Sequence, residues 1–530
     1  MSRQIKDIFW ENLTKKLDAS TIAVAALDPK DWNDNSQPRI YVPHDAISQY
    51  EYYKQVSVEM PQVNLDVVLL PKEVTLEVYM GMMKKPGILA LEMEERVKDP
   101  VTGEKDMSGL PFFVPGGRFN ELFYWDSYFS AFGLLDSGRV QLVESIVKNF
   151  VFEIQHYGLI PNANRSYFLL RSQPPFLTSL TLKVYGLIRH EPHANEFLRR
   201  AVLAAIKEYN QVWVSEPRYD PETGLSRYRP MGIGVPLETE KGHFSNILDP
   251  YCRKHNMSED EFIEAYNTRR ILEPELDEYF LHDRALRESG HDVTLRLEGV
   301  CADLATVDLN CLLYQYETDI SYIIRIFFDD KLIVPVEFCA PGDKPNRIET
   351  SSAWDRKSLL RKERIDKYLW NSVKGTYLDY NTKTHKQHTV ESATCFYALW
   401  CGVATPEQAS RLVHGALPKF EMVGGLASTN VETLPQRGKN LKCHDAHQWD
   451  FPFGWAPHQI MTWDGLKRYG YYKEAERICY KWLYSVTKVF VDFNGAVVEK
   501  YDVTNQRDPH KVTAEYGNQG LDFEGYAKEG

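Results

Sequence analysis

Apolar residues recur along much of the chain at the three- and four-residue spacing of an amphipathic helix. From Arg139 to Ile154 they form one stripe along one helical face, which predicts a helix with a single buried side. Similar stripes predict helices over residues 198–212, 412–417 and 478–486. Residues 303–327 predict two helices around a short break, with a strand as the alternative at the β-branched end. Alternating patterns typical of strands are few and short. The sequence therefore predicts a mainly helical fold.

A pattern of helix, glycine turn and short extended segment occurs three times. The helices end near Trp213, near Trp370 and beyond Trp482, and the segments that follow are Gly224 with 226–228, Gly375 with 376–380, and Gly495 with 497–502. Glycine at such a position is typical of a turn, and repetition of a helical unit is typical of ring-like or solenoid architectures. We interpret the pattern as a ring of helical hairpins, an α-toroid whose functional site lies among the loops at one end.

No low-complexity linker divides the chain. Residues 28–43 are rich in Asp, Asn and Pro and predict a surface loop, since these residues favour turns. We place the edge between an N-terminal extension and the main domain near this segment. The expected organisation is an extension over residues 1–60 that packs on a toroidal catalytic domain over residues 61–530.

Charge and composition exclude several classes of protein. The net charge of −12 and the pI near 5.7 argue against a nucleic-acid-binding protein, which normally presents a basic face. No apolar run reaches the length of a membrane span, and the opening segment lacks the apolar core of a secretory signal. Eight cysteines without a C-x-x-C pair favour reduced thiols. Together these features predict a cytoplasmic protein.

Two segments combine aromatic, charged and turn-forming residues. Residues 115–128 read PGGRFNELFYWDSY, and residues 448–457 read QWDFPFGWAP. Arg118 offers a fork of hydrogen-bond donors, Phe119 and Trp125 offer flat apolar faces, and Asp126 is a charged acceptor. An Arg–Asp pair at a helix start would have the same composition, so the spacing alone leaves both interpretations open. The functional interpretation is a sugar pocket.

These two segments resemble the two signature motifs of the trehalases, and the resemblance extends over nearly the whole chain. Residues 2–20 and 244–317 are most similar to the neutral trehalases of fungi. The resemblance implies an (α/α)6 toroid that hydrolyses trehalose with inversion and needs no cofactor. The sequence departs from the first motif at Phe123, where the family usually has Tyr. Either a sugar contact is lost there, or the adjacent Tyr124 compensates.

Two further elements resemble the catalytic segments of the family. ESGHD, at residues 288–292, implies that Asp292 is the general acid, and EKYD, at residues 499–502, implies that Glu499 is the general base. An inverting glycosidase needs one protonated and one ionised carboxyl group, roughly 6.5–9.5 Å apart so that a water molecule fits between them. Because the two residues lie far apart in the sequence, only the fold can bring them together.

The expected substrate contacts come from both motifs and from the loops between them. Glu238 is the expected contact of its loop, with the neighbouring Glu240 as the alternative, and residues 160–176 hold a dense group of hydroxyl-binding side chains. A buried array of this kind discriminates strongly between sugars, because a wrong sugar leaves its polar groups unpaired. The expected contacts are Arg118, Phe119, Trp125, Asp126, Asn162, Arg171, Ser172, Gln173, Glu238, Arg287, Gly290 and Glu515.

The sequence also bears on whether the protein binds a metal ion or a protein partner. Cys443, His444 and His447 have no common zinc-ligand spacing, so we expect no metal there. The resembling fungal enzymes carry an N-terminal regulatory region with a calcium-binding segment that governs activation by a 14-3-3 protein. No matching calcium loop occurs in this sequence, so that partner is expected only through a regulatory region outside it.

Two other functions are compatible with a toroid and a sugar pocket. One is a related glycosidase that acts on another α-glucoside, which the complete signature motifs disfavour. The other is a sugar-binding regulator that lacks one catalytic carboxylate. Both Asp292 and Glu499 are present, and this favours an enzyme.

Overall fold

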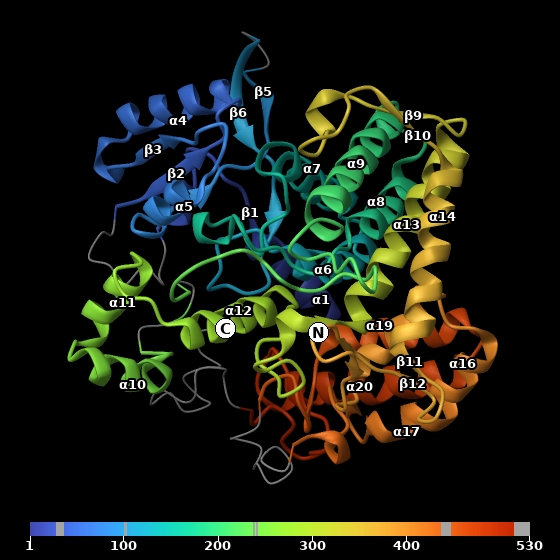
Figure 1. Ribbon diagram of the computed structural model, residues 1–530. Coiled ribbons are helices and arrows are strands. Elements are labelled where there is room, and N and C mark those ends of the chain that lie inside the picture. The colour runs from blue at the N-terminus through green and yellow to red at the C-terminus, as the bar shows by residue number, and fades with distance from the viewer. Residues whose placement is uncertain (28–36, 100–102, 237–238, 240–241, 436–446, 513–530) are drawn as a thin grey trace.

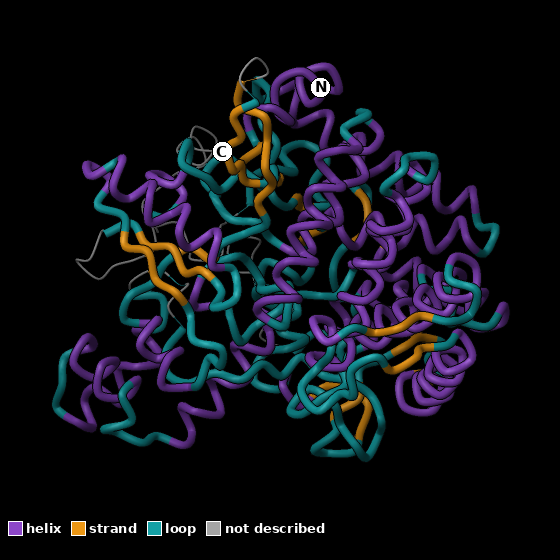
Figure 2. The backbone as a smooth tube through the Cα atoms, turned by 90° about the horizontal axis from the view of Figure 1, so that it is seen from above, coloured by secondary structure: helices purple, strands orange, loops and turns teal. Residues whose placement is uncertain are grey.

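The computed structural model describes residues 1–27, 37–99, 103–236, 239, 242–435 and 447–512. Helices make up about half of the described chain, and the strands are short (Figure 2). The α-helices are α1 (Ser2–Gln4), α2 (Trp10–Asn12), α3 (Ile22–Ala25), α4 (Ile47–Glu59), α5 (Leu76–Met83), α6 (Tyr124–Asp136), α7 (Val140–Tyr157), α8 (Leu177–Ile188), α9 (Ala194–Glu208), α10 (Ser245–His255), α11 (Glu259–Asn267), α12 (Pro274–Glu288), α13 (Val307–Phe327), α14 (Ser351–Arg364), α15 (Tyr397–Trp400), α16 (Pro406–Arg411), α17 (Leu417–Phe420), α19 (Ala456–Arg468) and α20 (Tyr472–Asp492). The strands are β1 (Thr14–Lys15), β2 (Arg39–Val42), β3 (Asp66–Leu69), β4 (Ile88–Leu89), β5 (Met93–Asp99), β6 (Glu104–Gly109), β7 (Phe112–Phe113), β8 (Leu304–Ala305), β9 (Leu332–Val334), β10 (Arg347–Glu349), β11 (Trp370–Asn371), β12 (Thr376–Tyr377), β13 (Tyr380–Asn381), β14 (Lys386–Gln387), β15 (Glu421–Met422), β16 (Gly425–Leu426), β17 (Phe453–Gly454) and β18 (Tyr501–Asp502).

The main body is a ring of helical pairs, and this confirms the predicted helical toroid. The inner helices α6, α8, α13, α15 and α19 pack on one another in chain order. The helices that follow them, α7, α9, α14, α16 and α20, form an outer layer around that row (Figure 1). Because each inner helix is covered on several sides, its apolar residues merge into one large core.

The predicted helices agree with the structure except at one place. The stripe over residues 139–154 forms α7, which ends at Gly158 in the left-handed conformation. The predicted break within residues 303–327 is wrong, since α13 is one continuous helix. The apolar pattern is interrupted there by polar residues that are nevertheless buried: Glu317 pairs with Arg361, and Asp319 accepts a hydrogen bond from Thr178.

A recurring contact joins neighbouring outer helices, and we call it the clasp. A glycine in the segment that follows one outer helix lies against a polar side chain at the end of the next outer helix. The three pairs are Gly158 with Gln211, Gly224 with Arg364, and Gly375 with Arg411. A Cβ atom on Gly224 would lie 2.3 Å from the Arg364 guanidinium carbon, and Arg364 Nη1 donates a hydrogen bond to the Gly224 carbonyl at 3.0 Å. Gly224 also has a φ of +67°, a left-handed conformation that favours glycine, so a side chain there would be strained as well as crowded against Arg364.

The clasp glycines account for part of the repeat seen in the sequence. Gly375 turns the chain between β11 and β12, which pair antiparallel, and Gly224 lies between Tyr219 and Ser226, which form an isolated bridge. After α20 and Gly495, the chain enters β18, which pairs with β17. The predicted order of helix, glycine turn and extended segment is thus confirmed at all three positions.

The N-terminal region adds a small parallel sheet of order β3-β2-β4. In β2 the side chains alternate, so Ile40 and Val42 join the main core while Tyr41 packs with Met82 of α5. Helices α4 and α5 cover opposite faces of this sheet (Figure 1). The sheet takes strands from both sides of residue 60, and the domain boundary at that residue stays a prediction.

The remaining described elements lie outside the ring. Helices α10, α11 and α12 enclose a separate small core, and α10 and α11 project away from the toroid (Figure 1). No described helix combines the length and the apolar character needed to cross a membrane.

Candidate active site

An aromatic wall lies at the start of two inner helices. Trp125, in the first turn of α6, lies 5.7 Å from Trp449 between ring centroids, and Trp449 stacks on Trp455 at 4.1 Å with the rings nearly parallel. His291 completes the wall at 4.7 Å from Trp449 and 5.6 Å from Trp125. The fold thus joins both signature motifs and the ESGHD segment in one cluster.

Gly290 is needed for this junction. Its φ of +75° lies in the left-handed region, which side chains other than glycine rarely adopt. A Cβ atom there would lie 2.5 Å from the Trp125 ring. The glycine therefore lets the chain after α12 pass directly against the aromatic wall.

The loop between α7 and α8 lies on the other side of Trp125. The Trp125 backbone N–H donates to Gln173 Oε1 at 3.1 Å, and the Asn162 N–H donates to the Arg171 carbonyl at 2.9 Å. Ser172 is fully buried and donates from Oγ to the Ile160 carbonyl at 2.7 Å. The predicted contact residues of this loop are therefore brought together at the wall.

A buried ion pair supports that loop from behind. Glu288, the last residue of α12, pairs with Arg218 and accepts a hydrogen bond from the Ser172 backbone N–H at 3.0 Å. Both charged side chains are nearly inaccessible to solvent. Removing one member of a buried pair leaves an uncompensated charge, so this pair ties the ESGHD segment to residues 160–173.

Aromatic rings and guanidinium groups stack on one another around the first half of the first motif. Arg118 is exposed and lies over the Phe119 ring at 5.1 Å, and Phe119 packs edge-on against Phe123. Phe123 packs in turn against a cluster that includes Phe168, over which Arg171 lies at 4.7 Å. An apolar ring at position 123 suits this packing.

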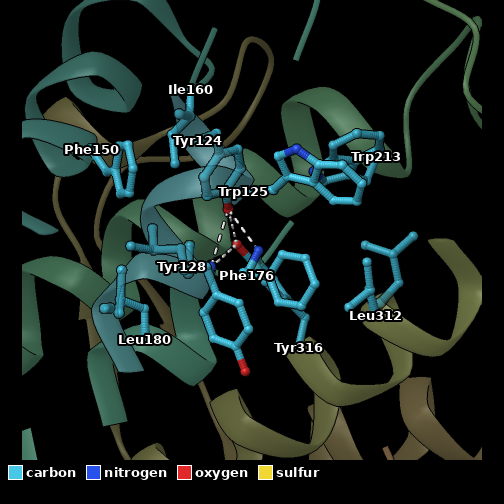
Figure 3. Packing of buried hydrophobic residues seen from close by; sticks show 14 of the residues in the cluster. Tyr124, Trp125, Tyr128, Phe150, Ile160, Phe176, Leu180, Trp213, Leu312 and Tyr316 are labelled. Atoms are coloured by element: carbon cyan, nitrogen blue, oxygen red, sulfur yellow. Dashed lines mark hydrogen bonds between the residues drawn. The ribbon is translucent and has the colours of Figure 1, made fainter. Parts of the chain in front are cut away.

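Tyr124 has a structural role instead of the compensating one. Its buried hydroxyl lies 2.8 Å from that of Tyr316 and accepts hydrogen bonds from the backbone N–H groups of Phe176 and Leu177 at the start of α8 (Figure 3). Burial also raises the pKa of the neighbouring Glu208 to about 7. The Tyr124 hydroxyl is thus committed to the inner core and does not replace the hydroxyl that the family usually carries at position 123.

Asp292 is the residue directly after His291 of the aromatic wall. Its side chain is 34% exposed, and its Oδ2 lies 3.7 Å from Nη1 of Arg287. Arg287 also pairs with Asp283 at 3.0 Å, and its Nη2 lies 3.2 Å from Nε2 of His243. The Asp283 carboxylate balances part of the Arg287 charge near Asp292.

Glu499 approaches the wall from the C-terminal part of the chain. It is exposed, whereas the next residue, Lys500, is buried and donates to Gln448 Oε1 at 2.8 Å. Because Gln448 precedes Trp449, this hydrogen bond fixes the EKYD segment against the second motif. Strand β18 then pairs with β17 inside that motif.

Asp126 and Glu499 are close enough to influence each other electrostatically. Burial, together with the negative charge of Glu499, raises the pKa of the Asp126 carboxyl to about 7, because both effects disfavour its charged form. Glu499 of the EKYD segment therefore acts electrostatically on the first motif, while Lys500 links the same segment to the second motif.

Replacing Asp126 by asparagine should change how stability depends on pH. With a folded pKa near 7 against an ordinary value of 3.8, the stabilisation from protonated Asp126 is fully present below pH 3.8 and lost as the pH rises through 7. The Tm of Asp126→Asn relative to the parent should therefore be higher at pH 8 than at pH 5. Thermal denaturation at both pH values measures this, with Asp136→Asn, an exposed site on the same helix, as the control. An equal Tm difference at both pH values would contradict the expectation.

Some predicted site residues are not described. Glu238 and its alternative Glu240, as well as Glu515, lie outside the described residues, as do Cys443 and His444. Among the residues that the structure does describe, no group of three or more His, Cys, Asp or Glu side chains could hold a metal ion. Of the predicted contacts that are described, Gly290 and Gln173 contact Trp125 of the wall, and Arg287 lies beside Asp292.

Sequence reasoning missed several residues that build this site. Arg218 and Glu288 were not predicted, although Glu288 opens the ESGHD segment. Lys500 lies within EKYD. Neighbouring residues of an extended segment face opposite sides, so a site residue at Glu499 was a signal that Lys500 faces the interior. His458 directly follows the second motif, but a single histidine in a helix gives no sign of a partner at residue 291.

Comparison with known proteins agrees with this arrangement. A family model described as Trehalase matches residues 1–530. The cytosolic neutral trehalases of Pyricularia oryzae and Saccharomyces cerevisiae are 60% and 52% identical to this chain over its full length, which spans 72% and 69% of theirs. A solved structure of a neutral trehalase from Saccharomyces cerevisiae, 49% identical, superposes with a TM-score of 0.90 over 97% of this chain and 90% of that one. With both signature motifs assembled in one wall, this chain belongs to the trehalase family.

Proposed function

We propose that this chain hydrolyses α,α-trehalose to two glucose molecules by a single inverting displacement. The family and relatives named neutral trehalase support the substrate. The observation that carries the mechanism is the meeting of ESGHD and EKYD at one aromatic wall, with Asp292 beside Arg287 and Glu499 beside Asp126. The relatives are also named cytosolic, which supports the cytoplasm as the location.

In the proposed reaction, Asp292 protonates the oxygen that links the two glucose units. Glu499 removes a proton from a water molecule, which attacks the anomeric carbon from the opposite face. The wall of Trp125 and Trp449 presents flat faces to a sugar ring, and the charged and amide groups around it suit sugar hydroxyls. The two carboxyl groups supply the whole proton balance, so the proposed step draws on no metal ion or cofactor.

The stereochemistry of the products tests this proposal. Inversion at one anomeric carbon releases one glucose as the β-anomer, while the leaving glucose keeps its α-configuration. Proton NMR during the first minutes should therefore show α- and β-glucose in equal amounts, before mutarotation mixes them. Initial release of α-glucose alone would indicate a retaining reaction and overturn the mechanism.

Substrate selectivity tests the class of sugar separately. A pocket built to pair the hydroxyls of trehalose leaves polar groups unpaired with another disaccharide. Trehalose should be hydrolysed, whereas maltose and sucrose should be cleaved at a small fraction of that rate. Faster hydrolysis of maltose would favour the related α-glucosidase, and binding of trehalose without hydrolysis would favour the sugar-binding regulator. The expected regulation by a 14-3-3 protein and calcium stays a prediction.

A further inference from the structure

His291 connects the proposed acid to the aromatic wall. It directly precedes Asp292, and its ring is buried against Trp125 and Trp449. On the other side of Asp292, the Trp449 backbone N–H donates to the Val293 carbonyl at 3.1 Å. The backbone that carries the acid is therefore held by the wall on both sides.

The His291 ring has a second buried histidine as its partner. Its Nε2 lies 3.1 Å from Nε2 of His458, and the two rings are 5.2 Å apart at an angle of 29°. His458 lies in the first turn of α19 and is 1% exposed. The contact therefore links an inner helix of the toroid to the residue before Asp292.

Hydrogen-bond accounting fixes the tautomers of this pair. Ser289 Oγ has a single hydrogen, which it donates to the Leu286 carbonyl at 2.6 Å. The same oxygen lies 3.3 Å from His291 Nδ1, so Nδ1 must carry the hydrogen in that contact. A neutral imidazole has one donor and one acceptor nitrogen. His291 Nε2 is then the acceptor, and His458 Nε2 is the donor.

Both rings are neutral over the ordinary pH range. Burial, with a smaller contribution from the charge of Arg296, lowers the pKa of His291 to about 3. Burial and the proximity of His291 likewise hold the pKa of His458 well below its usual value. A second proton on His291 would occupy Nε2 and remove the acceptor nitrogen, so the low pKa of His291 preserves the hydrogen bond.

We propose that His458 is a positioning residue for Asp292, which acts by donating its Nε2–H to His291 and thereby fixing the backbone that carries the acid. The inference rests on the proposed function of Asp292. Without this donor, the buried Nε2 acceptor of His291 would have no hydrogen-bond partner, which costs free energy. Rotation of the His291 ring would reduce this cost. Rotation of His291 would move the Asp292 carboxyl relative to the sugar, and a displacement of 1 Å in an active site can lower the rate on the order of 100-fold.

Glutamine and asparagine at position 458 form a matched test. The terminal amide of glutamine reaches the position of histidine Nε2, whereas that of asparagine reaches the position of Nδ1. His458→Gln should retain a kcat close to that of the parent. His458→Asn and His458→Leu should lower kcat roughly 10- to 100-fold, with little change in KM, because the binding groups remain in place.

Thr462→Val is the control for disturbance of the inner helix. Thr462 is buried one turn after His458 on α19, and its substitution should leave kcat unchanged. Equal losses in His458→Gln and His458→Asn, a loss carried by KM, or a fall in Tm without a fall in kcat would each overturn the proposal.

A second measurement does not depend on catalysis. Nitrogen-15 NMR of the imidazole rings in the parent protein should show a proton on Nδ1 of His291 and on Nε2 of His458. The reverse tautomers would overturn the inference even if the parent is fully active. Failure of the proposed function would instead appear as a parent enzyme that does not hydrolyse trehalose.

Discussion

Asp292→Asn should lower kcat on trehalose about 10²- to 10⁴-fold, the range usually supplied by a positioned general acid. Asparagine keeps the size of the side chain, so the contact with Arg287 and the aromatic wall should be preserved and KM should change little. Steady-state rates of glucose release measure the effect. This is one of the two largest effects that we expect from a single substitution.

A substrate with a better leaving group separates acid catalysis from general damage to the site. Fluoride departs without protonation, so Asp292→Asn should hydrolyse α-glucosyl fluoride much faster, relative to the parent, than it hydrolyses trehalose. Asp283→Asn is the matched control, because Asp283 contacts the same arginine but is not proposed to transfer a proton. Wild-type activity of Asp292→Asn on trehalose would refute the assignment of the acid.

Glu499→Ala should lower kcat by a similar factor, about 10²- to 10⁴-fold, on both trehalose and α-glucosyl fluoride. Both substrates need an activated water molecule, whatever the leaving group. Added azide is a nucleophile that needs no base, so it should restore turnover of the fluoride and yield β-glucosyl azide, which NMR identifies. Loss of activity on trehalose alone would contradict the role as base.

Glu476→Gln is a control for Glu499, because it removes an exposed carboxylate from α20 and should leave both rates unchanged. Formation of α-glucosyl azide in the Glu499→Ala reaction would place the attack on the other face of the sugar and exclude the proposed geometry.

The helical part of the fold was predictable because burial on one face leaves a direct trace in the sequence. Residues 139–154 show this trace and form most of α7. Helix α13 does not, since it is enclosed by other helices and buries polar residues such as Glu317 and Asp319 in specific pairs. Apolar spacing alone therefore predicts a break in the helix at such residues, although side chains from other helices pair with their polar groups.

The candidate site was predictable at the level of motifs but not of contacts. Trp125, Gly290 and Asp292 belong to segments that resemble the family, and the structure places them together at the wall. The sequence alone contains no information that Arg218 supports Glu288 or that His458 lies beside His291, because these pairs are far apart in the chain. Phe123 and Tyr124 could likewise be distinguished only by which of them faces the inner core.

The clasps between outer helices imply that the ring is modular. Each clasp joins only two successive units, through a glycine and one polar side chain. It does not depend on the length of the segment that connects the two units. The described part of residues 214–306 holds the helices α10, α11 and α12 between neighbouring units, whereas residues 371–396 hold only short strands and one helical turn. Insertions can therefore accumulate in these connections during evolution while the helical ring keeps its geometry.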